Sequence, residues 1–398
     1  MMRKICLGLS LLMIVVLALP VLAQDMETPQ MGLWDECATP ENLPETVTIG
    51  VVFGLSGPIS VYGGPQQQAV QLAVDEINAS GYLGEGTTLV AMFEDSAGDA
   101  EQAIAAMTKL VEEDQVVAVI GPTLSAEAFS ADPVAQENST PVMGVSNTAS
   151  GITDMGDYVF RDSLPESSVI PGTIAQATEI LGLEKVGVLY GNDDDFTLSG
   201  YDVFVQALED NNVAITNEQT FARGDVDFNP QLTALLADSP DALVVSALAA
   251  EAVQIITQAR DLGYEGPIIG GNGLNSPAVL EQSGDASNGV IVGAAWNIAS
   301  PDPLSEVWTS NYQAAYDANP DQFATQAYTG AWLMATAIRC GDSADRTAVR
   351  DALAAIQDFP SPLGSFSFSE DRNPVHAPVV QIAQDGAFAL LGAEDGDM

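Results

Sequence analysis

Apolar residues along the chain follow two alternating patterns, one typical of buried strands and one typical of helices. Residues 47–53 form a run of strand-forming residues. Within residues 65–80, apolar side chains recur at the i, i+3, i+4 and i+7 spacing of a helix. The strand and helix patterns continue to alternate. They predict, in order, a strand at 88–94, a helix at 99–113, a strand at 116–120, a helix at 125–137 and a strand at 141–145.

A second round of the same alternation begins after Pro165. Several of its strands are apolar throughout, which indicates a parallel sheet covered by helices on both faces. We therefore expect an α/β protein with two similar rounds, completed by the shared remainder at 289–398. The second round predicts helices at 168–182, 197–211, 229–237 and 249–262, and strands at 186–190, 213–221, 242–246 and 267–270.

The N-terminal segment predicts export from the cytoplasm. Arg3 and Lys4 precede an apolar stretch that ends in small residues, which is typical of a signal peptide over residues 1–23 cleaved after Ala23. An uncleaved membrane anchor is the alternative, although the stretch is short for a span. We expect the mature protein to be soluble and periplasmic or extracellular, with residues 24–45 as a polar tether.

The charge of the chain is strongly negative and excludes two classes of partner. The sequence has 55 acidic and 11 basic residues and a formal net charge of −44 at pH 7. Such a surface repels nucleic acid and anionic lipid, so we expect neither to bind. The acidic residues are mostly scattered, which indicates a solvated acidic surface.

Cysteine and histidine are scarce, and this limits the chemistry that the chain can perform. Cys37 and Cys340 remain after cleavage, and in an oxidising compartment they can form one disulfide between the tether and the body; two free thiols are the alternative. Cys6 lies too early to be the lipidated cysteine of a lipoprotein. Two cysteines and the single His376 predict no metal site and no cofactor.

Enzymatic motifs are missing from the sequence. It has no P-loop and no G-x-S-x-G elbow, and "GGNGLN" lacks the third glycine of a dinucleotide-binding fingerprint. Catalysis by a serine, histidine and aspartate would require His376, which lies near the C-terminal end. We predict that the chain is not an enzyme, with a hydrolase that uses His376 as the alternative.

Four loops that follow predicted strands share small residues, hydroxyl groups and exposed backbone. In an open parallel sheet, ligands bind beyond the carboxyl ends of the strands, where such loops lie. Hydroxyls and free amides at helix N-termini can also hold an anion. A simple helix cap is the alternative for a residue such as Ser125. The loops are "GLSGPISVYGG" (54–64), "GPTLSAEA" (121–128), "GVSNTASG" (144–151) and "GGNGLNSP" (270–277).

At these loops the sequence resembles the solute-binding proteins of ABC importers, specifically the branched-chain amino acid binding family with the type I periplasmic-binding fold. "AVQLAVDEINASG", "TPVMGVSNTASGIT" and "FATQAYTGAWLMATAI" extend the match, which covers nearly all of residues 46–392. The resemblance implies two Rossmann-like lobes with parallel sheets, joined by a three-segment hinge. Lobe 1 is then expected at 46–165 and 296–375, and lobe 2 at 166–295 and 376–398.

The resemblance also implies which residues bind the ligand. The family's ligand carboxylate is held at positions that match Ser125, Ser146 and Thr148. Aromatic residues cover the ligand at positions that match Tyr62, Phe196 and Phe323.

Two positions depart from the family pattern. Asn272 stands where the branched-chain binders carry a glutamate for the ligand's ammonium, and Leu248 stands where they carry a tyrosine. An ammonium buried against a neutral amide is less well compensated than against a carboxylate. One residue of the run 193–195 is a candidate replacement for the glutamate, and a solvated acidic run is the alternative.

These observations predict a receptor that captures a small carboxylate-bearing solute, an amino acid of the branched-chain type, and delivers it to an ABC permease. Two alternatives stay open. The ligand can be a carboxylate or amide without an ammonium, or the chain can be a ligand-sensing module for a membrane receptor.

Overall fold

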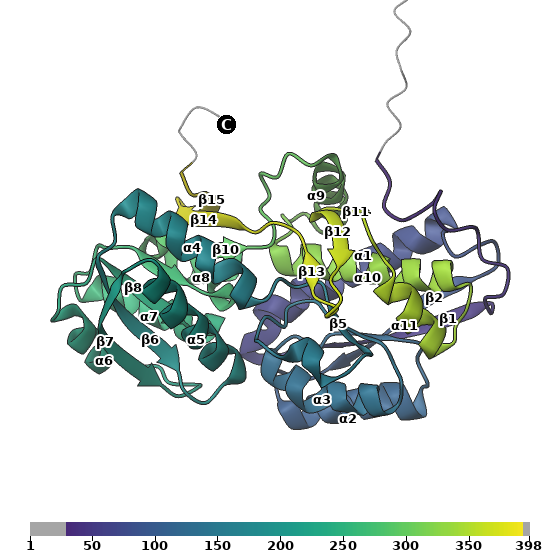
Figure 1. The fold of residues 1–398 in the computed structure, drawn as a ribbon, viewed down its shortest axis with the longest axis horizontal. Helices are drawn as coiled ribbons and strands as arrows, with labels where there is room; N and C mark the ends of the chain where they lie inside the picture. Colours follow the sequence, from purple (N-terminus) through teal and green to yellow (C-terminus); the bar gives the residue numbers. More distant parts are fainter. Residues whose placement is uncertain (1–28, 393–398) are drawn as a thin grey trace, which may run out of the picture.

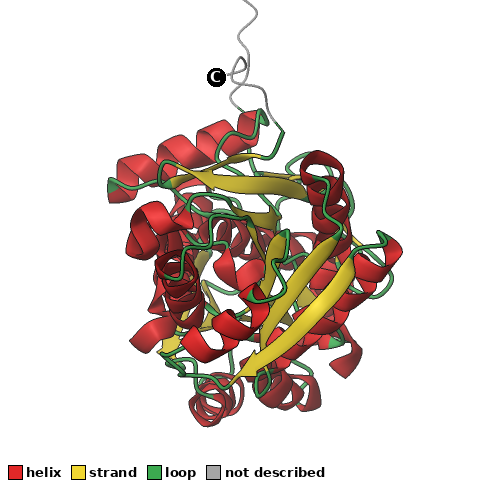
Figure 2. Cartoon of the chain, turned by 90° about the vertical axis from the view of Figure 1, so that its left-hand side faces the viewer, coloured by secondary structure: helices red, strands yellow, loops and turns green. Residues whose placement is uncertain are grey.

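The computed structural model describes residues 29–392, which form two α/β lobes side by side (Figure 1). Seen from the lobe 2 end, strands lie between layers of helices (Figure 2). The predicted α/β fold with two parallel-sheet lobes is therefore confirmed. The predicted signal peptide and the first residues of the tether lie outside the described residues. None of the described helices is both long enough and apolar enough to span a membrane.

Lobe 1 contains a five-stranded parallel sheet of order β2-β1-β3-β4-β5. Its strands are β1 (Thr46–Phe53), β2 (Thr88–Asp95), β3 (Val119–Ile120), β4 (Val142–Gly144) and β5 (Val159–Arg161). A small antiparallel sheet comprises β11 (Phe359–Ser361), β12 (Gly364–Phe368) and β13 (Pro374–Val375). The helices are α1 (Ser60–Ser80), α2 (Ala100–Thr108), α3 (Ser125–Glu137), α9 (Pro303–Tyr316), α10 (Gln322–Gly341) and α11 (Arg346–Ala354), with short turns η1 (Gly57–Ile59), η2 (Lys109–Glu113) and η3 (Ile152–Met155).

Lobe 2 contains a seven-stranded sheet of order β15-β14-β10-β9-β8-β6-β7, in which β14 and β15 run antiparallel to their neighbours. Its strands are β6 (Lys185–Gly191), β7 (Ala214–Phe221), β8 (Ala242–Ser246), β9 (Ile268–Gly270), β10 (Val290–Ala294), β14 (Val379–Gln384) and β15 (Ala387–Leu390). Its helices are α4 (Glu166–Leu181), α5 (Asp195–Asp210), α6 (Asn229–Leu236), α7 (Ala249–Asp261) and α8 (Pro277–Ser283), with short turns η4 (Asn272–Leu274) and η5 (Gly284–Ser287).

The described chain passes between the lobes at three places. It crosses between β5 and α4, between β10 and α9, and between β13 and β14. The last crossing returns the chain to lobe 2, where β14 pairs with β10. Since neither lobe is continuous in sequence, the three crossings form the hinge about which the lobes can move.

Helix α1 begins earlier than the sequence pattern predicted. The apolar spacing predicted a helix from residue 65, but α1 starts at Ser60 and places Tyr62 in its first turn instead of in a loop. The glycines before residue 65 resemble a helix break, yet Gly63 has a packing role. A Cβ atom at Gly63 would lie 2.1 Å from the carbonyl oxygen of Gly54. Glycine therefore lets α1 approach the end of β1 closely.

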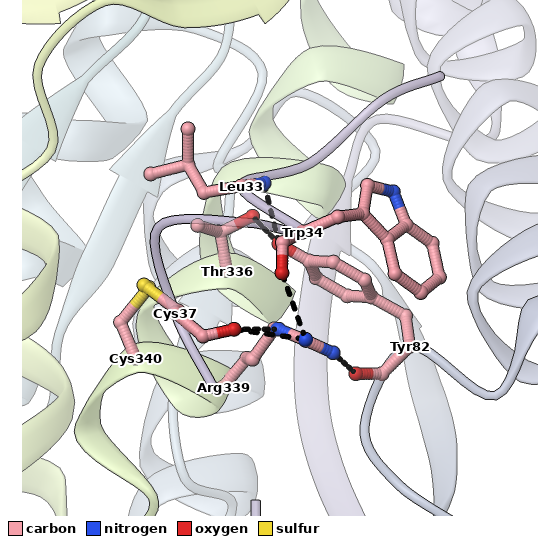
Figure 3. The surroundings of a disulfide bond; sticks show 7 residues. All are labelled: Leu33, Trp34, Cys37, Tyr82, Thr336, Arg339 and Cys340. Carbon is pink, nitrogen blue, oxygen red and sulfur yellow. Dashed lines mark hydrogen bonds between the residues drawn. A yellow bond between two sulfur atoms is a disulfide. The ribbon is translucent and has the colours of Figure 1, made fainter. Parts of the chain in front are cut away.

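The described part of the N-terminal segment packs against lobe 1 (Figure 3). Cys37 and Cys340 form a disulfide across 303 residues of sequence. The Trp34 and Tyr82 rings meet edge to face, with centroids 4.8 Å apart. The buried Arg339 guanidinium lies over both rings and donates hydrogen bonds to the carbonyl oxygens of Cys37, Trp34 and Tyr82. This segment is thus fixed to α10 by the disulfide and by Arg339, and to the turn after α1 by the Trp34–Tyr82 contact.

Candidate functional site

A small cavity lies between the lobes, at the carboxyl ends of strands from both parallel sheets. Its lobe 1 wall follows β1, β3 and β4, and its lobe 2 wall follows β6, β8 and β9. The volume is about 20 Å³, which is enough for one water molecule. The lining residues are Tyr62, Thr123, Leu124, Ser125, Ser146, Phe196, Leu248, Asn272, Gly273 and Phe323.

Seven of the eight ligand-binding residues that the sequence predicted line this cavity. The exception is Thr148, which does not reach it. Its hydroxyl is buried and has no partner among the described residues, and its carbonyl accepts a hydrogen bond from the Glu166 amide at 2.9 Å. The ligand-binding role of all eight residues is still a prediction.

Besides the Tyr62 phenol, the lobe 1 wall carries three serine and threonine hydroxyl groups, and two of these already donate their protons within the protein. The Thr123 hydroxyl donates to Gln66 Oε1 at 2.9 Å. The Ser146 hydroxyl donates to the Thr123 carbonyl at 2.6 Å and accepts from Gln66 Nε2 at 2.8 Å. Both hydroxyls are fixed by Gln66, a buried residue of α1 that no sequence pattern singled out.

The third hydroxyl, that of Ser125, keeps its proton available. Ser125 Oγ accepts a hydrogen bond from the Ala149 amide at 3.2 Å and donates to no protein atom in the described chain. Ser125 is also the first residue of α3, where backbone amides lack helical acceptors and the helix dipole favours negative charge. A free hydroxyl beside a helix N-terminus is suited to hold an anion such as a carboxylate.

Tyr62 crosses the cavity from lobe 1 and contacts lobe 2. Its hydroxyl donates to the Gly273 carbonyl at 2.6 Å and accepts from the Ala249 amide at 2.7 Å. Its ring lies 4.7 Å from the Phe323 ring. Burial raises the pKa of the Tyr62 hydroxyl above its usual value, so the group stays protonated and can donate. Tyr62 therefore holds the lobes together across the cavity.

The acidic run at 193–195 does not line the cavity. The Asp194 carboxylate caps α5 by accepting from the Phe196 and Thr197 amides, at 3.0 and 3.2 Å. The Asp193 carboxylate accepts from the Arg223 amide at 2.9 Å. This geometry does not support the expectation that one of these residues replaces the family's glutamate.

Asn272, at the start of η4, is held from two sides. Its backbone amide donates to the Glu166 carboxylate at 2.9 Å, and burial raises the pKa of Glu166 to about 7. Its side-chain oxygen accepts from Gln322 Nε2. Gln322 Oε1 in turn accepts from the Ala295 amide at 2.9 Å. The position that departs from the family pattern is therefore rigidly oriented at the cavity.

A family model described as "Periplasmic binding protein" matches residues 46–387, which is most of the chain. The chain belongs to the periplasmic binding protein family. The Leu/Ile/Val-binding protein BraC3 of Rhizobium johnstonii is 27% identical over 328 residues, covering 81% of this chain and 88% of the relative. The leucine-, isoleucine-, valine-, threonine- and alanine-binding protein of Pseudomonas aeruginosa is 24% identical, covering 82% and 86%.

Solved structures of the periplasmic binding protein family share the fold. The branched-chain amino acid transporter substrate-binding protein LivJ of Streptococcus pneumoniae, in complex with isoleucine, gives a TM-score of 0.81 at 29% identity, covering 86% of this chain and 97% of that chain. A solute-binding protein of an ABC transporter from R. palustris, in complex with benzoate, gives a TM-score of 0.79 at 22% identity, covering 87% and 96%. The second comparison concerns the fold alone.

Periplasmic binding proteins of this kind bind small molecules, work with ABC permeases and are not enzymes. The hydrolase alternative is therefore set aside. His376, on which it depended, lies at the third crossing, where burial lowers its pKa to about 4. Neither of its ring nitrogens has a hydrogen-bond partner within residues 29–392.

Replacing Tyr62 by phenylalanine is expected to loosen the contact between the lobes. The change removes both hydrogen bonds of the hydroxyl and leaves the Gly273 carbonyl and the Ala249 amide without partners, at a cost of about 1–3 kcal/mol. Hydrogen exchange at the Ala249 amide should become about 10- to 100-fold faster. Tyr158→Phe is the matched control, because that hydroxyl bonds Thr347 within lobe 1. Equal exchange at Ala249 in both variants would contradict the assignment.

Proposed function

We propose that the chain is an extracytoplasmic solute-binding protein that captures a small carboxylate-bearing solute between its lobes and delivers it to an ABC importer. The observation that carries this proposal is the uncommitted hydroxyl proton of Ser125 at the first residue of α3, on the wall of the cavity. A buried carboxylate requires hydrogen-bond donors, and this end of the cavity supplies them.

The rest of the cavity wall is mostly apolar and can contact an apolar body attached to the carboxylate once the lobes part to admit it. Phe196 and Leu248 from lobe 2 face Tyr62 and Phe323 from lobe 1. Apolar side chains of a solute about the size of a branched-chain amino acid would be buried among them. The S. pneumoniae protein LivJ is in complex with isoleucine and the R. palustris protein is in complex with benzoate, and both ligands combine a carboxylate with an apolar body.

Entry of such a solute requires the lobes to part, because the cavity has room for only one water molecule. Besides the hydrogen bonds of Tyr62, two contacts between the lobes would break. Arg223 of lobe 2 donates to the Gly98 carbonyl of lobe 1 at 3.0 Å. Ser199 of lobe 2 accepts from the Ser150 amide of lobe 1 at 2.9 Å. A solute bound by both lobes would hold them slightly further apart than in this structure and would favour that closed, liganded state over an open one. The liganded state is the form presented to a permease in this proposal.

A thermal-shift screen of the purified mature protein tests this function. The screen pairs each small carboxylate with its uncharged amide, for example 4-methylpentanoate with 4-methylpentanamide. A ligand at about 100 times its dissociation constant stabilises the folded state by about 2.7 kcal/mol. We expect the melting temperature to rise with at least one carboxylate and not with its amide. The absence of a rise with any carboxylate would contradict the proposed function.

Replacing Ser125 by alanine is expected to weaken binding of the carboxylate by about 1–3 kcal/mol, because the buried anion loses a hydrogen-bond donor. Isothermal titration calorimetry measures the change. Ser130→Ala is the matched control, since Ser130 lies on the same helix and its hydroxyl donates to the Ala126 carbonyl away from the cavity. Wild-type affinity in the Ser125 variant would remove this residue from the site.

A further inference from the structure

Among the residues that the structure describes, Asn272 is the one polar side chain on the lobe 2 wall of the cavity. The other lobe 2 residues on the wall are Phe196, Leu248 and Gly273, and no charged side chain lines the cavity within the described residues. The chemistry of Asn272 therefore decides what the end of the ligand nearest lobe 2 can be.

Hydrogen bonds fix which end of the Asn272 amide is free. The Ala295 backbone amide can only donate, so the group of Gln322 that it contacts must be the carbonyl oxygen. The NH₂ group of Gln322 therefore donates to Asn272, and the Asn272 atom that accepts must be the side-chain oxygen. Turning the Asn272 amide over would bring two NH₂ groups together. Asn272 Nδ2 is left without an acceptor in the described part of the chain, and Asn272 lines the cavity.

A free NH₂ group has the wrong polarity for an ammonium. An ammonium carries three donors and no acceptor, so burial requires oxygen atoms around it. Neither nearby carboxylate lines the cavity: Glu166 accepts from the Asn272 backbone amide, and Glu251 accepts from the Gly224 amide. The Gly273 carbonyl accepts from Tyr62 in this structure, so an ammonium would have to share or displace that bond. An α-amino acid would therefore bury its ammonium against a donor.

We propose that the cavity selects 2-oxo acids with an apolar side chain over the corresponding amino acids, a specificity that rests on the function proposed above. A 2-oxo acid keeps the carboxylate for Ser125 and the apolar body for Phe196 and Leu248. It replaces the ammonium by a carbonyl oxygen, which accepts the hydrogen bond that Asn272 Nδ2 offers. Asn272 determines this specificity, and Gln322 acts through it as a positioning residue.

Calorimetric titration with three ligands of one carbon skeleton tests the proposal. The ligands are 4-methyl-2-oxopentanoate, L-leucine and 4-methylpentanoate, which has no group at the second carbon. We expect the wild-type protein to bind the 2-oxo acid at least about tenfold more tightly than either of the others. Equal or tighter binding of leucine, or equal binding of 4-methylpentanoate, would overturn the proposal and leave the proposed function standing. Failure of all three and of every other carboxylate would overturn the proposed function itself.

Two variants test the role of the amide. Asn272→Glu places an acceptor at the cavity, so leucine should gain and the 2-oxo acid should lose at least about tenfold in affinity. Gln322→Glu can still accept from Ala295 but cannot donate, so the Asn272 amide turns over and its oxygen faces the ligand. This second variant should shift the preference in the same direction without touching the cavity wall. Unchanged preference in both variants contradicts the proposal. Gln254→Glu, an exposed position on α7, controls for the added charge.

Discussion

Replacing Arg339 by methionine is expected to lower the free energy of unfolding by about 3–5 kcal/mol. Methionine keeps much of the side-chain volume but leaves the carbonyl oxygens of Cys37, Trp34 and Tyr82 without their donor. It also removes a cation from the faces of the two rings, at 5.2 and 4.7 Å from their centroids. Urea denaturation followed by circular dichroism measures the loss.

Arg350→Met is the control for Arg339, because Arg350 belongs to the same lobe but pairs with the exposed carboxylates of Asp157 and Asp351. Exposed ion pairs contribute about 0–1 kcal/mol. If the free energy of unfolding falls by the same amount in both variants, the network around the disulfide does not stabilise lobe 1 in the way described.

Replacing Glu166 by glutamine is expected to raise stability at pH 8 by about 3 kcal/mol relative to the wild-type protein. Burial raises the pKa of Glu166 to about 7, so the folded state favours the protonated form. This contribution to stability is fully present below the unfolded pKa, near 4.5. It is lost as the pH rises through 7. Glutamine is uncharged at every pH, and its oxygen can still accept from the Asn272 amide.

The measurement for Glu166 is the free energy of unfolding of both proteins at several values between pH 5 and pH 8. As the pH rises, the free energy of unfolding of the variant should increase relative to that of the wild-type protein. Burial also raises the pKa of Asp321 to about 7, but this group is the same in both proteins and cancels. Glu179→Gln, at an exposed position of α4, controls for the lost negative charge. A difference that is constant with pH would contradict the burial argument.

Much of the fold follows from the sequence because the sheets are covered on both faces. Strands such as β8 are buried along their whole length and therefore stand out as apolar runs between amphipathic helices. The pattern missed β5 and η4, each of only three residues, and the seven-residue helix α8. Elements this short hold too few residues to show a period.

The site could be predicted in part, for a different reason. Positions such as Ser125 and Phe196 were predicted because they match ligand-binding positions of the family that the sequence resembles. Gln66 and Gln322 could not be predicted this way, since each acts on a residue at least 50 positions away through the direction of a hydrogen bond. Asp194 shows the opposite case, because its carboxylate caps the start of α5 and it does not line the cavity.

The most direct test of the proposed function is a calorimetric titration of the wild-type protein and its Ser125→Ala variant with the carboxylate that gives the largest thermal shift. We predict one bound carboxylate per chain, with an affinity that falls about 5- to 150-fold in the variant. Absence of binding to the wild-type protein, or binding that the variant leaves unchanged, would contradict capture of a carboxylate at the cavity between the lobes.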